Sequence, residues 1–330
     1  MPPSRVEPAS PSGSNSGLSS AQTAFFEEHG FLHVPGVLSA RELTLLRRAC
    51  DRLVAPASPT VLRNADYCYA HLAATGSVLH RINHMLQKGP EFLQLWGHPR
   101  LLGMAESIQG PEVLPVALAL VMKTPGCGLA VPWHRDPAFS TMAWGTNLGI
   151  YLDDADGENG MLHVIPGSHR RRCFDLEQAV AQHGFELPGA IPVPVRAGDV
   201  ILHSENVLHG SRQVQSQRQR RVLYFGARCI PEQLSLRGLD ESWVLAYARI
   251  LHHAIRSRVN GIGADEGETP FTWRARDPRY HQALAADAYV ELRIDGGDGH
   301  GDPALALGFV DDQHARTGAA LSLVPEPARS

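Results

Sequence analysis

The chain has 330 residues, of which 43% are hydrophobic, and its formal net charge is −4. This composition supports a sizeable core in one large domain or two small ones, and the charge balance excludes a strongly basic surface for nucleic acid or anionic membranes. Five scattered cysteines without a CxxC pair fit neither a disulfide framework nor a zinc ribbon. No stretch approaches the ~20 apolar residues of a membrane helix, and the N-terminus has no signal-peptide pattern. We therefore expect a cytoplasmic protein that binds neither nucleic acid nor membranes, with no prediction of its oligomeric state.

The N-terminal region is predicted to contain a tail, a helix and a short strand. Residues 1–18 are rich in Pro, Ser and Gly, which predicts a flexible tail. Ser19 and Gln22 have the spacing of a capping box and Gly30 supplies a stop, so we expect a helix between them. The apolar run 31–34 then predicts a strand that ends before a Pro-Gly pair.

Two further helices are expected before the chain changes character. Ser39 and Glu42 form a second capping-box pattern, and apolar residues follow it at helical spacing. Another helical pattern covers residues 90–108. The segment 56–76 carries no motif and is predicted to be a loop. Arg81 is within reach of a substrate, but a surface ion pair is the favoured interpretation.

From residue 113 onwards, short apolar runs alternate with Gly, Pro and Asp. This pattern predicts many short strands in an antiparallel sandwich or barrel, followed by helical periodicity over residues 234–259. The expected fold class is α+β, with one β core and its flanking helices in a domain of residues 19–294. Residues 295–330 are expected to form a C-terminal extension that is partly mobile. The predicted strands are 113–122, 146–152, 161–165, 191–195, 199–202 and 221–227, and loops without a motif are 170–188 and 261–280.

Two histidines and one aspartate in the β region are candidate metal ligands. His134 and Asp136 are two residues apart, so their side chains share one face if the segment is a strand. His209 lies far along the chain, and a rolled sheet would bring it beside the first pair. Two imidazoles and a carboxylate that leave coordination positions open are the ligand set of non-heme Fe(II) oxygenases. His203 is the nearest competitor for the distal position and is predicted to be a pocket or packing residue.

Several short motifs surround these ligands. Each motif alone is weak evidence for a function, but the combination of all of them in this order along the chain is specific. They are the helix-and-strand segment 25–39, Trp-His-Arg-Asp at 133–136, the Asp- and Gly-rich turn 152–160, Pro-Gly-Ser-His at 166–169 and His-Gly-Ser at 209–211, with Arg220 eleven residues after His209.

With this combination the chain, from about residue 20 to residue 230, resembles the phytanoyl-CoA dioxygenase family of Fe(II)- and 2-oxoglutarate-dependent oxygenases. The resemblance implies a double-stranded β-helix, a jelly-roll and cupin-like core flanked by helices. It also implies Fe(II) bound by His134, Asp136 and His209, with 2-oxoglutarate as cosubstrate and O2 as oxidant.

The resemblance assigns the cosubstrate to Arg220 and Ser211. A guanidinium binds a carboxylate through two parallel hydrogen bonds, so Arg220 is expected on the distal carboxylate of 2-oxoglutarate, with the Ser211 hydroxyl as a further donor. Lys123 is either a pocket residue for an anionic group of the substrate or cosubstrate, or a surface lysine at a strand end. Asn147 is a further candidate for the pocket.

The chain departs from the family pattern at two positions. Arg135 stands between the first two ligands, where the family commonly has Gln, and on a strand its side chain faces away from the metal. Gly149 stands where some members have an aromatic residue, which changes how the cosubstrate is flanked on that side.

The expected reaction is hydroxylation of a small molecule, an amino acid or a natural-product intermediate, with release of succinate and CO2. Desaturation, epoxidation and ring formation are possible with the same site. Two other classes remain open from the residues alone: a β-barrel binding module without turnover, and a cupin-type metal-dependent hydrolase or isomerase.

Overall fold

The computed structural model describes residues 17–57, 66–72, 76–125, 129–136, 145–170, 174–235, 240–259, 261 and 263–281. The predicted C-terminal extension lies outside the described residues, as does the predicted N-terminal tail up to residue 16. Leu18, at the end of that tail, donates its amide hydrogen to Ser107 Oγ at 2.9 Å. Among the described helices, none combines the length and apolar character needed to cross a membrane.

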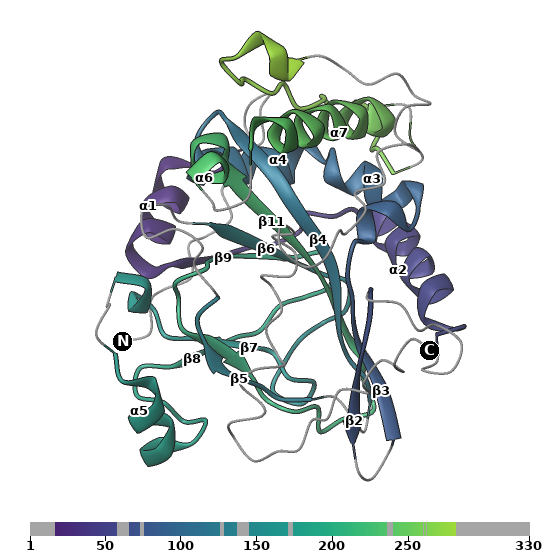
Figure 1. Ribbon diagram of the computed structural model, residues 1–330. Coiled ribbons are helices and arrows are strands. Elements are labelled where there is room, and N and C mark those ends of the chain that lie inside the picture. The colour runs from purple at the N-terminus through teal and green to yellow at the C-terminus, as the bar shows by residue number, and fades with distance from the viewer. Residues whose placement is uncertain are drawn as a thin grey trace, which may run out of the picture.

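Two antiparallel sheets form the centre of the molecule (Figure 1). The larger sheet contains, in spatial order, β1 (Phe31–Val34), β9 (Val200–Ser204), β6 (Thr146–Tyr151), β11 (Arg220–Cys229), β4 (Val113–Lys123), β3 (Gly76–Ile82) and β2 (Tyr67–Leu72). The smaller sheet contains β5 (Val131–His134), β10 (His209–Ser211), β7 (Leu162–Val164) and β8 (Ile191–Val193). The fold class is therefore α+β with antiparallel sheets, as the sequence predicts.

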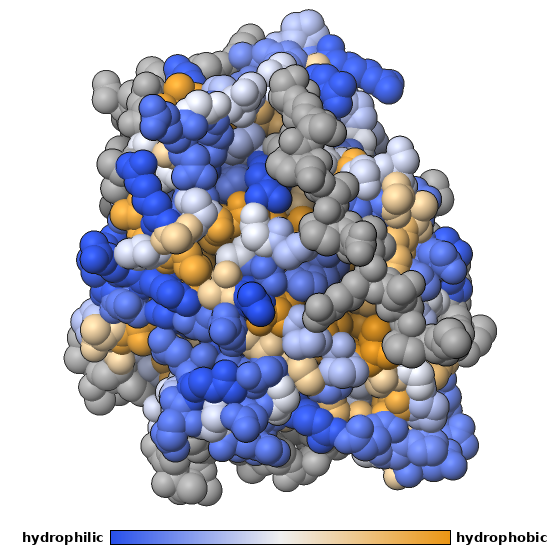
Figure 2. Space-filling view, turned by 180° about the vertical axis from the view of Figure 1, so that it is seen from behind, coloured by the Kyte–Doolittle hydropathy of each residue, from blue (hydrophilic) through white to orange (hydrophobic). Residues whose placement is uncertain are grey.

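Helices cover the face of the larger sheet that points away from the smaller one, and α5 lies beside the smaller sheet (Figure 1). Figure 2 shows the molecule from behind, where hydrophilic side chains dominate and hydrophobic ones form small separate groups, as expected for a face in contact with water. The helices are α1 (Ser20–His29), α2 (Ala40–Val54), α3 (Pro90–Trp96), α4 (Pro99–Gln109), α5 (Leu176–His183), α6 (Ile230–Ser235) and α7 (Glu241–Val259), with 3-10 turns η1 (Met85–Gln87), η2 (Ser168–Arg170) and η3 (Pro278–His281).

Side chains alternate between the two faces of the larger sheet along each strand, so the two faces have different neighbours. Leu148 and Leu223 are fully buried in the main core between the sheet and the helices. Val222 points to the opposite face and packs with Leu162 of the smaller sheet in a second core. That inner face also carries polar side chains such as Asn147, so the space between the sheets is apolar at one end and polar at the other.

The N-terminal elements form as the sequence predicts. Ser19 and Gln22 exchange hydrogen bonds at the start of α1, and Ser39 and Glu42 do so at the start of α2. Gly30 ends α1 with a φ of 78°, which lies in the left-handed region that favours glycine. β1 then pairs antiparallel with β9, the strand that leads toward the distal candidate ligand.

The predicted strands after residue 113 are all present, as β4, β6, β7, β8, β9 and β11, with ends that differ by a few residues. Three elements were missed. The segment 56–76, predicted to be a loop, contains β2 and the start of its hairpin partner β3, and the segment 170–188 contains α5.

The helical stretch predicted over residues 90–108 is present, but it is not one continuous helix. Two helices, α3 and α4, are separated there by Gly97 and His98. Pro99 begins α4, and its ring disfavours helical backbone at the residue before it. Gly97 also packs against the main chain of α7, where an added Cβ would lie 2.5 Å from the carbonyl carbon and oxygen of Ala254. The break therefore allows α3 to approach α7 closely.

We expect Gly97→Ala to lower the free energy of unfolding by about 1–3 kcal/mol, because the added methyl group forces α3 and α7 apart. The measurement is unfolding by urea. Gly157→Ala is the matched control, since Gly157 is exposed and an added Cβ there would meet only Met161 Cε, at 4.0 Å. Equal stability of the two variants would contradict the close approach of the helices.

Candidate active site

The three candidate metal ligands meet between the two sheets. His134 ends β5, His209 begins β10, and the two are direct partners in the antiparallel pair. Their Nε2 atoms each lie 3.5 Å from Asp136 Oδ1. The expectation that His134 and Asp136 share one strand is not met, because β5 stops at His134. Asp136 is positioned instead by its own amide, which donates to the carbonyl oxygen of Glu205 at 2.8 Å.

Hydrogen bonds fix the orientation of both imidazoles. His134 Nδ1 lies 2.8 Å from the carbonyl oxygen of Pro132, and His209 Nδ1 lies 3.0 Å from that of Val207. A carbonyl oxygen only accepts, so each Nδ1 carries the hydrogen and each Nε2 presents a lone pair to the centre of the triad. Burial and the neighbouring His134 lower the pKa of His209 to about 3, which keeps its ring neutral. This donor set fits a divalent transition metal.

Asp136 is held by a neighbour from the larger sheet. Asn147 donates from Nδ2 to Asp136 Oδ2 at 2.5 Å, which leaves Oδ1 facing the two histidines. Burial opposes ionisation of this carboxyl, but the adjacent imidazoles, foremost that of His209, hold its pKa well below the usual value. Asn147 therefore orients the carboxylate of Asp136, and it also lines the pocket, for which the sequence made it a candidate.

We expect Asn147→Ala to weaken Fe(II) binding by about 10–100-fold, because Asp136 loses the donor that orients it. The measurement is the Fe(II) concentration that half-saturates succinate formation at saturating 2-oxoglutarate. Asn206→Ala is the matched control, since Asn206 lies outside the pocket, and it should leave that concentration unchanged. A normal iron requirement in Asn147→Ala would contradict the role.

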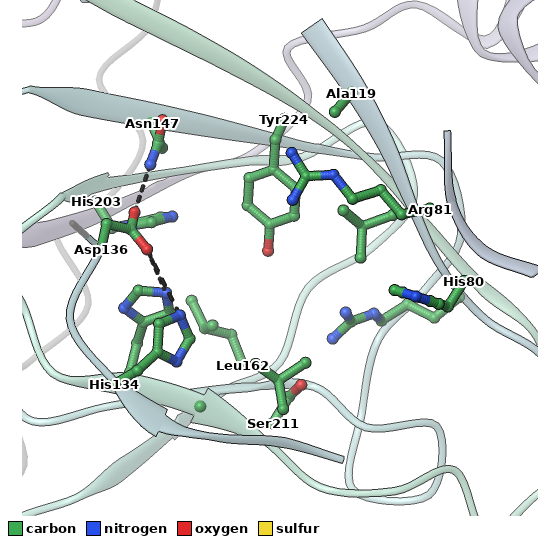
Figure 3. Close-up of a pocket in the computed structure, with 15 residues that line it drawn as sticks. His80, Arg81, Ala119, His134, Asp136, Asn147, Leu162, His203, Ser211 and Tyr224 are labelled. Carbon is green, nitrogen blue, oxygen red and sulfur yellow. Dashed lines mark hydrogen bonds and ion pairs between the residues drawn. The ribbon is translucent and has the colours of Figure 1, made fainter. Parts of the chain in front are cut away.

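Arg220 and Ser211 lie in the same pocket as the triad, and the empty space of this pocket, counted with the open solvent at its mouth, is about 670 Å³. Figure 3 shows Ser211 among the side chains that line it with His134 and Asp136. Arg220 is 2% exposed, and its Nη1 donates to the carbonyl oxygen of Gly160. Within the described residues its Nε makes no hydrogen bond and no carboxylate lies at ion-pair distance from the guanidinium. A buried cation in this state favours an anionic ligand, because a buried charge is costly unless it is paired.

Lys123 is buried rather than at the surface. It is the cross-strand partner of Arg220 in the β4–β11 pair, and its Nζ donates to the carbonyl oxygens of Leu129 and Arg212. Burial, aided by the positive charge of Arg220, lowers the pKa of Lys123. Its side chain also packs against Gly160, the residue that accepts from Arg220. Lys123 thus supports the wall behind Arg220, with its ammonium directed to main-chain oxygens.

Residues around the ligands explain the two departures from the family pattern. Arg135 turns away from the triad, as expected, and donates to the carbonyl oxygens of Ser168 and Asn206. Gly149 faces Tyr224, whose ring carbon Cε1 would lie 3.3 Å from an added Cβ. A larger residue at Gly149 would therefore crowd the Tyr224 ring, which lines the pocket.

Four further polar side chains line the pocket beside apolar ones: His203, Tyr224, Arg81 and His80 (Figure 3). His203 is a pocket residue, as the sequence predicts, and its Nε2 is buried without a partner among the described residues. The interpretation of Arg81 as a surface residue is wrong, because it is 7% exposed and faces the site. Tyr224 and His80 were not predicted. The alternation of β11 from Arg220 onwards places Tyr224 on the same face and was the available signal.

A second group of metal-ligating side chains, Glu42, His98 and Glu268, lies outside this pocket. Arg258 Nη2 lies 2.6 Å from Glu42 Oε1 and 2.6 Å from Glu268 Oε2. The guanidinium already pairs with both carboxylates and would repel a cation, so this group is a buried ion-pair network.

A triad of two histidines and one carboxylate, in one pocket with a buried arginine and between two antiparallel sheets, defines a 2-oxoglutarate-dependent non-heme iron oxygenase. The chain belongs to the phytanoyl-CoA dioxygenase family, whose model, described as phytanoyl-CoA dioxygenase (PhyH), matches residues 26–222. The resemblance seen in the sequence is thereby confirmed, and the cofactors are Fe(II), 2-oxoglutarate and O2.

Three relatives illustrate the range of the family. L-proline trans-4-hydroxylase of Streptomyces griseoviridis is 30% identical over 224 residues, which cover 59% of this chain and 80% of the relative. The crystal structure of AviO1 from Streptomyces viridochromogenes Tue57 is 29% identical, with a TM-score of 0.56 over 67% of this chain and 97% of that one. EctD from S. alaskensis, solved with bound Fe, has the same fold at 24% identity, with a TM-score of 0.56 over 70% of this chain and 85% of its own.

Proposed function

We propose that this oxygenase hydroxylates a small molecule, an amino acid or a natural-product intermediate, with release of succinate and CO2. The observation that carries the proposal is the placement of Arg220, a buried guanidinium without a described carboxylate partner, in one pocket with His134, Asp136 and His209. The similarity to L-proline trans-4-hydroxylase supports this reaction.

In the proposed site His134, Asp136 and His209 bind Fe(II), and Arg220 and Ser211 bind the distal carboxylate of 2-oxoglutarate. When bound, the iron and its cosubstrate supply an oxidant strong enough to take a hydrogen atom from an unactivated C–H bond. The protein holds the histidines in the right tautomer through main-chain carbonyls and fixes the ligands before the substrate arrives. Apolar side chains such as that of Leu162 limit the water around the metal.

The size of the pocket favours a small substrate. The cosubstrate must share the pocket with the substrate, which leaves only part of the space for the substrate.

The proposed catalytic domain comprises residues 19–294, with the two sheets arranged as a double-stranded β-helix. The part that follows the family match packs on the same core, since Phe271 and Trp273 are buried there and Trp273 Nε1 donates to the carbonyl oxygen of Val113 at 2.7 Å. This contact supports including the C-terminal helical region in the domain.

The test is succinate formation by the purified protein supplied with Fe(II), 2-oxoglutarate and air, first without any substrate and then with candidate small molecules. Slow succinate formation without substrate, and faster formation with one, are expected. A product that has gained one oxygen atom identifies hydroxylation, whereas loss of two hydrogens identifies desaturation or ring formation. The absence of succinate would favour a binding module, and activity that persists without O2 and 2-oxoglutarate would favour a hydrolase or isomerase.

A further inference from the structure

The imidazole of His203 lines the pocket, and one of its nitrogens has no partner among the described residues. His203 is 1% exposed and lies on β9, where it pairs with Asn147 of β6. Its ring lies beside that of His209, with 4.6 Å between the two ring centroids. Within the described part of the chain its Nε2 is buried and makes no hydrogen bond. A buried polar atom without a partner is costly, so we expect a ligand in the pocket to bond to it.

The surroundings of Nδ1 decide which nitrogen of His203 carries the hydrogen. Nδ1 lies 3.4 Å from the carbonyl oxygen of Ser204 and 3.9 Å from Asp136 Oδ2. Both oxygens are hydrogen-bond acceptors, so the hydrogen belongs on Nδ1 and Nε2 carries a lone pair. A ligand group that bonds to Nε2 must therefore donate a hydrogen, which a carbonyl or an ether oxygen cannot do.

Tyr224 presents a hydroxyl group to the same part of the pocket. Its ring is close to perpendicular to that of His203, with 6.1 Å between the centroids and 81° between the planes. In Figure 3 the hydroxyl points away from the larger sheet into the pocket, and His203 lies beside Asp136. Tyr224 pairs with Gly149 of β6, where an added Cβ would crowd the ring. The glycine at this position, a departure from the family pattern, therefore leaves room for Tyr224.

His203 and Tyr224 lie toward the metal ligands and away from the start of β11, which carries the residue assigned to the cosubstrate. Asn147, the partner of His203, pairs on its other side with Gly226 of β11. Arg220 begins that strand, Gly226 lies toward its other end, and Tyr224 stands between them on the face that lines the pocket. A group bound by His203 and Tyr224 is therefore separate from the distal carboxylate of 2-oxoglutarate, and it belongs to the substrate.

We propose that Tyr224 and His203 together bind a hydroxyl group of the substrate, so that this oxygenase acts on compounds that already carry an alcohol. The proposal rests on the proposed function and names its substrate class. The Tyr224 hydroxyl donates to the oxygen of the alcohol, and the alcohol donates to His203 Nε2. The rest of the substrate contacts apolar side chains of the pocket, those of Ala119, Val121 and Leu162.

A hydroxyl group fits this pair because it accepts and donates at one atom. A carbonyl or ether oxygen would leave His203 Nε2 without a donor. An ammonium group has hydrogens but no lone pair, so it would leave the hydrogen of Tyr224 without an acceptor. A water molecule has the same two capacities as an alcohol, and the test must therefore separate an alcohol from a water that stays in place beside any substrate.

The test compares alcohols with analogues in which only the hydroxyl is changed. Each set contains an alcohol, its methyl ether and the compound without that oxygen. L-tyrosine, O-methyl-L-tyrosine and L-phenylalanine form one set, and L-threonine, benzyl alcohol and menthol are the alcohols of the others. Each compound is scored by how far it raises succinate formation above the rate without substrate. We expect alcohols to stimulate, and their analogues to stimulate at least about 3-fold less. Equal stimulation within the sets, as a retained water would give, or no stimulation by any alcohol would overturn the proposal.

The two side chains are tested by the ratio of kcat/KM for an alcohol to that for the same compound without the oxygen. Tyr224→Phe should lower this ratio by about 3–10-fold, which corresponds to the loss of one neutral hydrogen bond. His203→Asn should lower it similarly, because the shorter amide replaces Nδ1 and does not reach the position of Nε2. His203→Gln places a polar atom near that position and should recover part of the ratio. A change in metal affinity affects both compounds alike and leaves the ratio unchanged.

Tyr69→Phe is the matched control for these variants. The Tyr69 hydroxyl also lacks a partner among the described residues, but Tyr69 is not among the described residues that line the pocket, so its ratio should equal that of the wild type. An unchanged ratio in either Tyr224→Phe or His203→Asn overturns the proposal. Absence of succinate from the wild type under all conditions overturns the proposed function instead.

Discussion

Asp136→Ala is expected to abolish the visible charge-transfer band that we expect Fe(II) and 2-oxoglutarate to give in the wild-type protein without oxygen. Asp136 is the carboxylate of the triad, and its Oδ1 lies 3.5 Å from the Nε2 atoms of both His134 and His209. Loss of an orienting neighbour alone costs such sites about 10–100-fold in affinity, so loss of a ligand should lower succinate formation by more than about 100-fold. The measurements are the absorption spectrum and the rate of succinate release.

The control for this variant is Asp156→Asn, in which an exposed carboxylate paired with Arg218 is neutralised. It should keep both the band and the rate. The thermal midpoint of the metal-free proteins, measured in parallel, separates loss of a ligand from loss of the fold. A band that survives in folded Asp136→Ala would contradict the assignment of the ligand.

Local signals in the sequence predicted much of the fold and the centre of the site. The capping boxes at Ser19 and Ser39 depend on side chains three residues apart, so no distant contact is needed to form them. Short apolar runs separated by Gly, Pro and Asp located the strands of the β core. His134, Asp136 and His209 were found because their residue types and the motifs around them are specific as a set, and the structure brings them together.

What the sequence could not predict depends on distant contacts. Arg81 was assigned to the surface because its environment is created by β4, some forty positions further along the chain, and by a β-bulge that has no signature in one sequence. The ammonium of Lys123 is directed to the carbonyl oxygens of Leu129 and Arg212, which belong to two separate segments. The helix break at Gly97 depends on a local signal instead, because Pro99 disfavours helical backbone at the residue before it.

Arg220→Gln is expected to raise the KM for 2-oxoglutarate by about 30-fold or more, because removing one partner of a buried charge pair typically costs that much in affinity. The KM of Arg220→Lys for 2-oxoglutarate should lie between those of Arg220→Gln and the wild type, since an ammonium cannot make the two parallel hydrogen bonds of a guanidinium. The affinity for Fe(II) should remain, because the metal ligands come from β5, β10 and the residue that follows β5. The measurements are 2-oxoglutarate titrations of succinate formation and of the charge-transfer band.

Stability distinguishes a binding role of Arg220 from a structural one. Without ligand its guanidinium is buried beside Lys123, a second buried cation, and its Nη1 donates to the main-chain oxygen of Gly160. Removing the charge should therefore leave the ligand-free protein as stable as the wild type or more so. Saturating 2-oxoglutarate should raise the thermal midpoint of the wild type and not that of Arg220→Gln. Arg218→Gln should behave as the wild type. Two results together would contradict the binding role: a ligand-free Arg220→Gln protein that unfolds more easily than the wild type, and an unchanged KM for 2-oxoglutarate. They would show that Arg220 supports the fold and does not bind the cosubstrate.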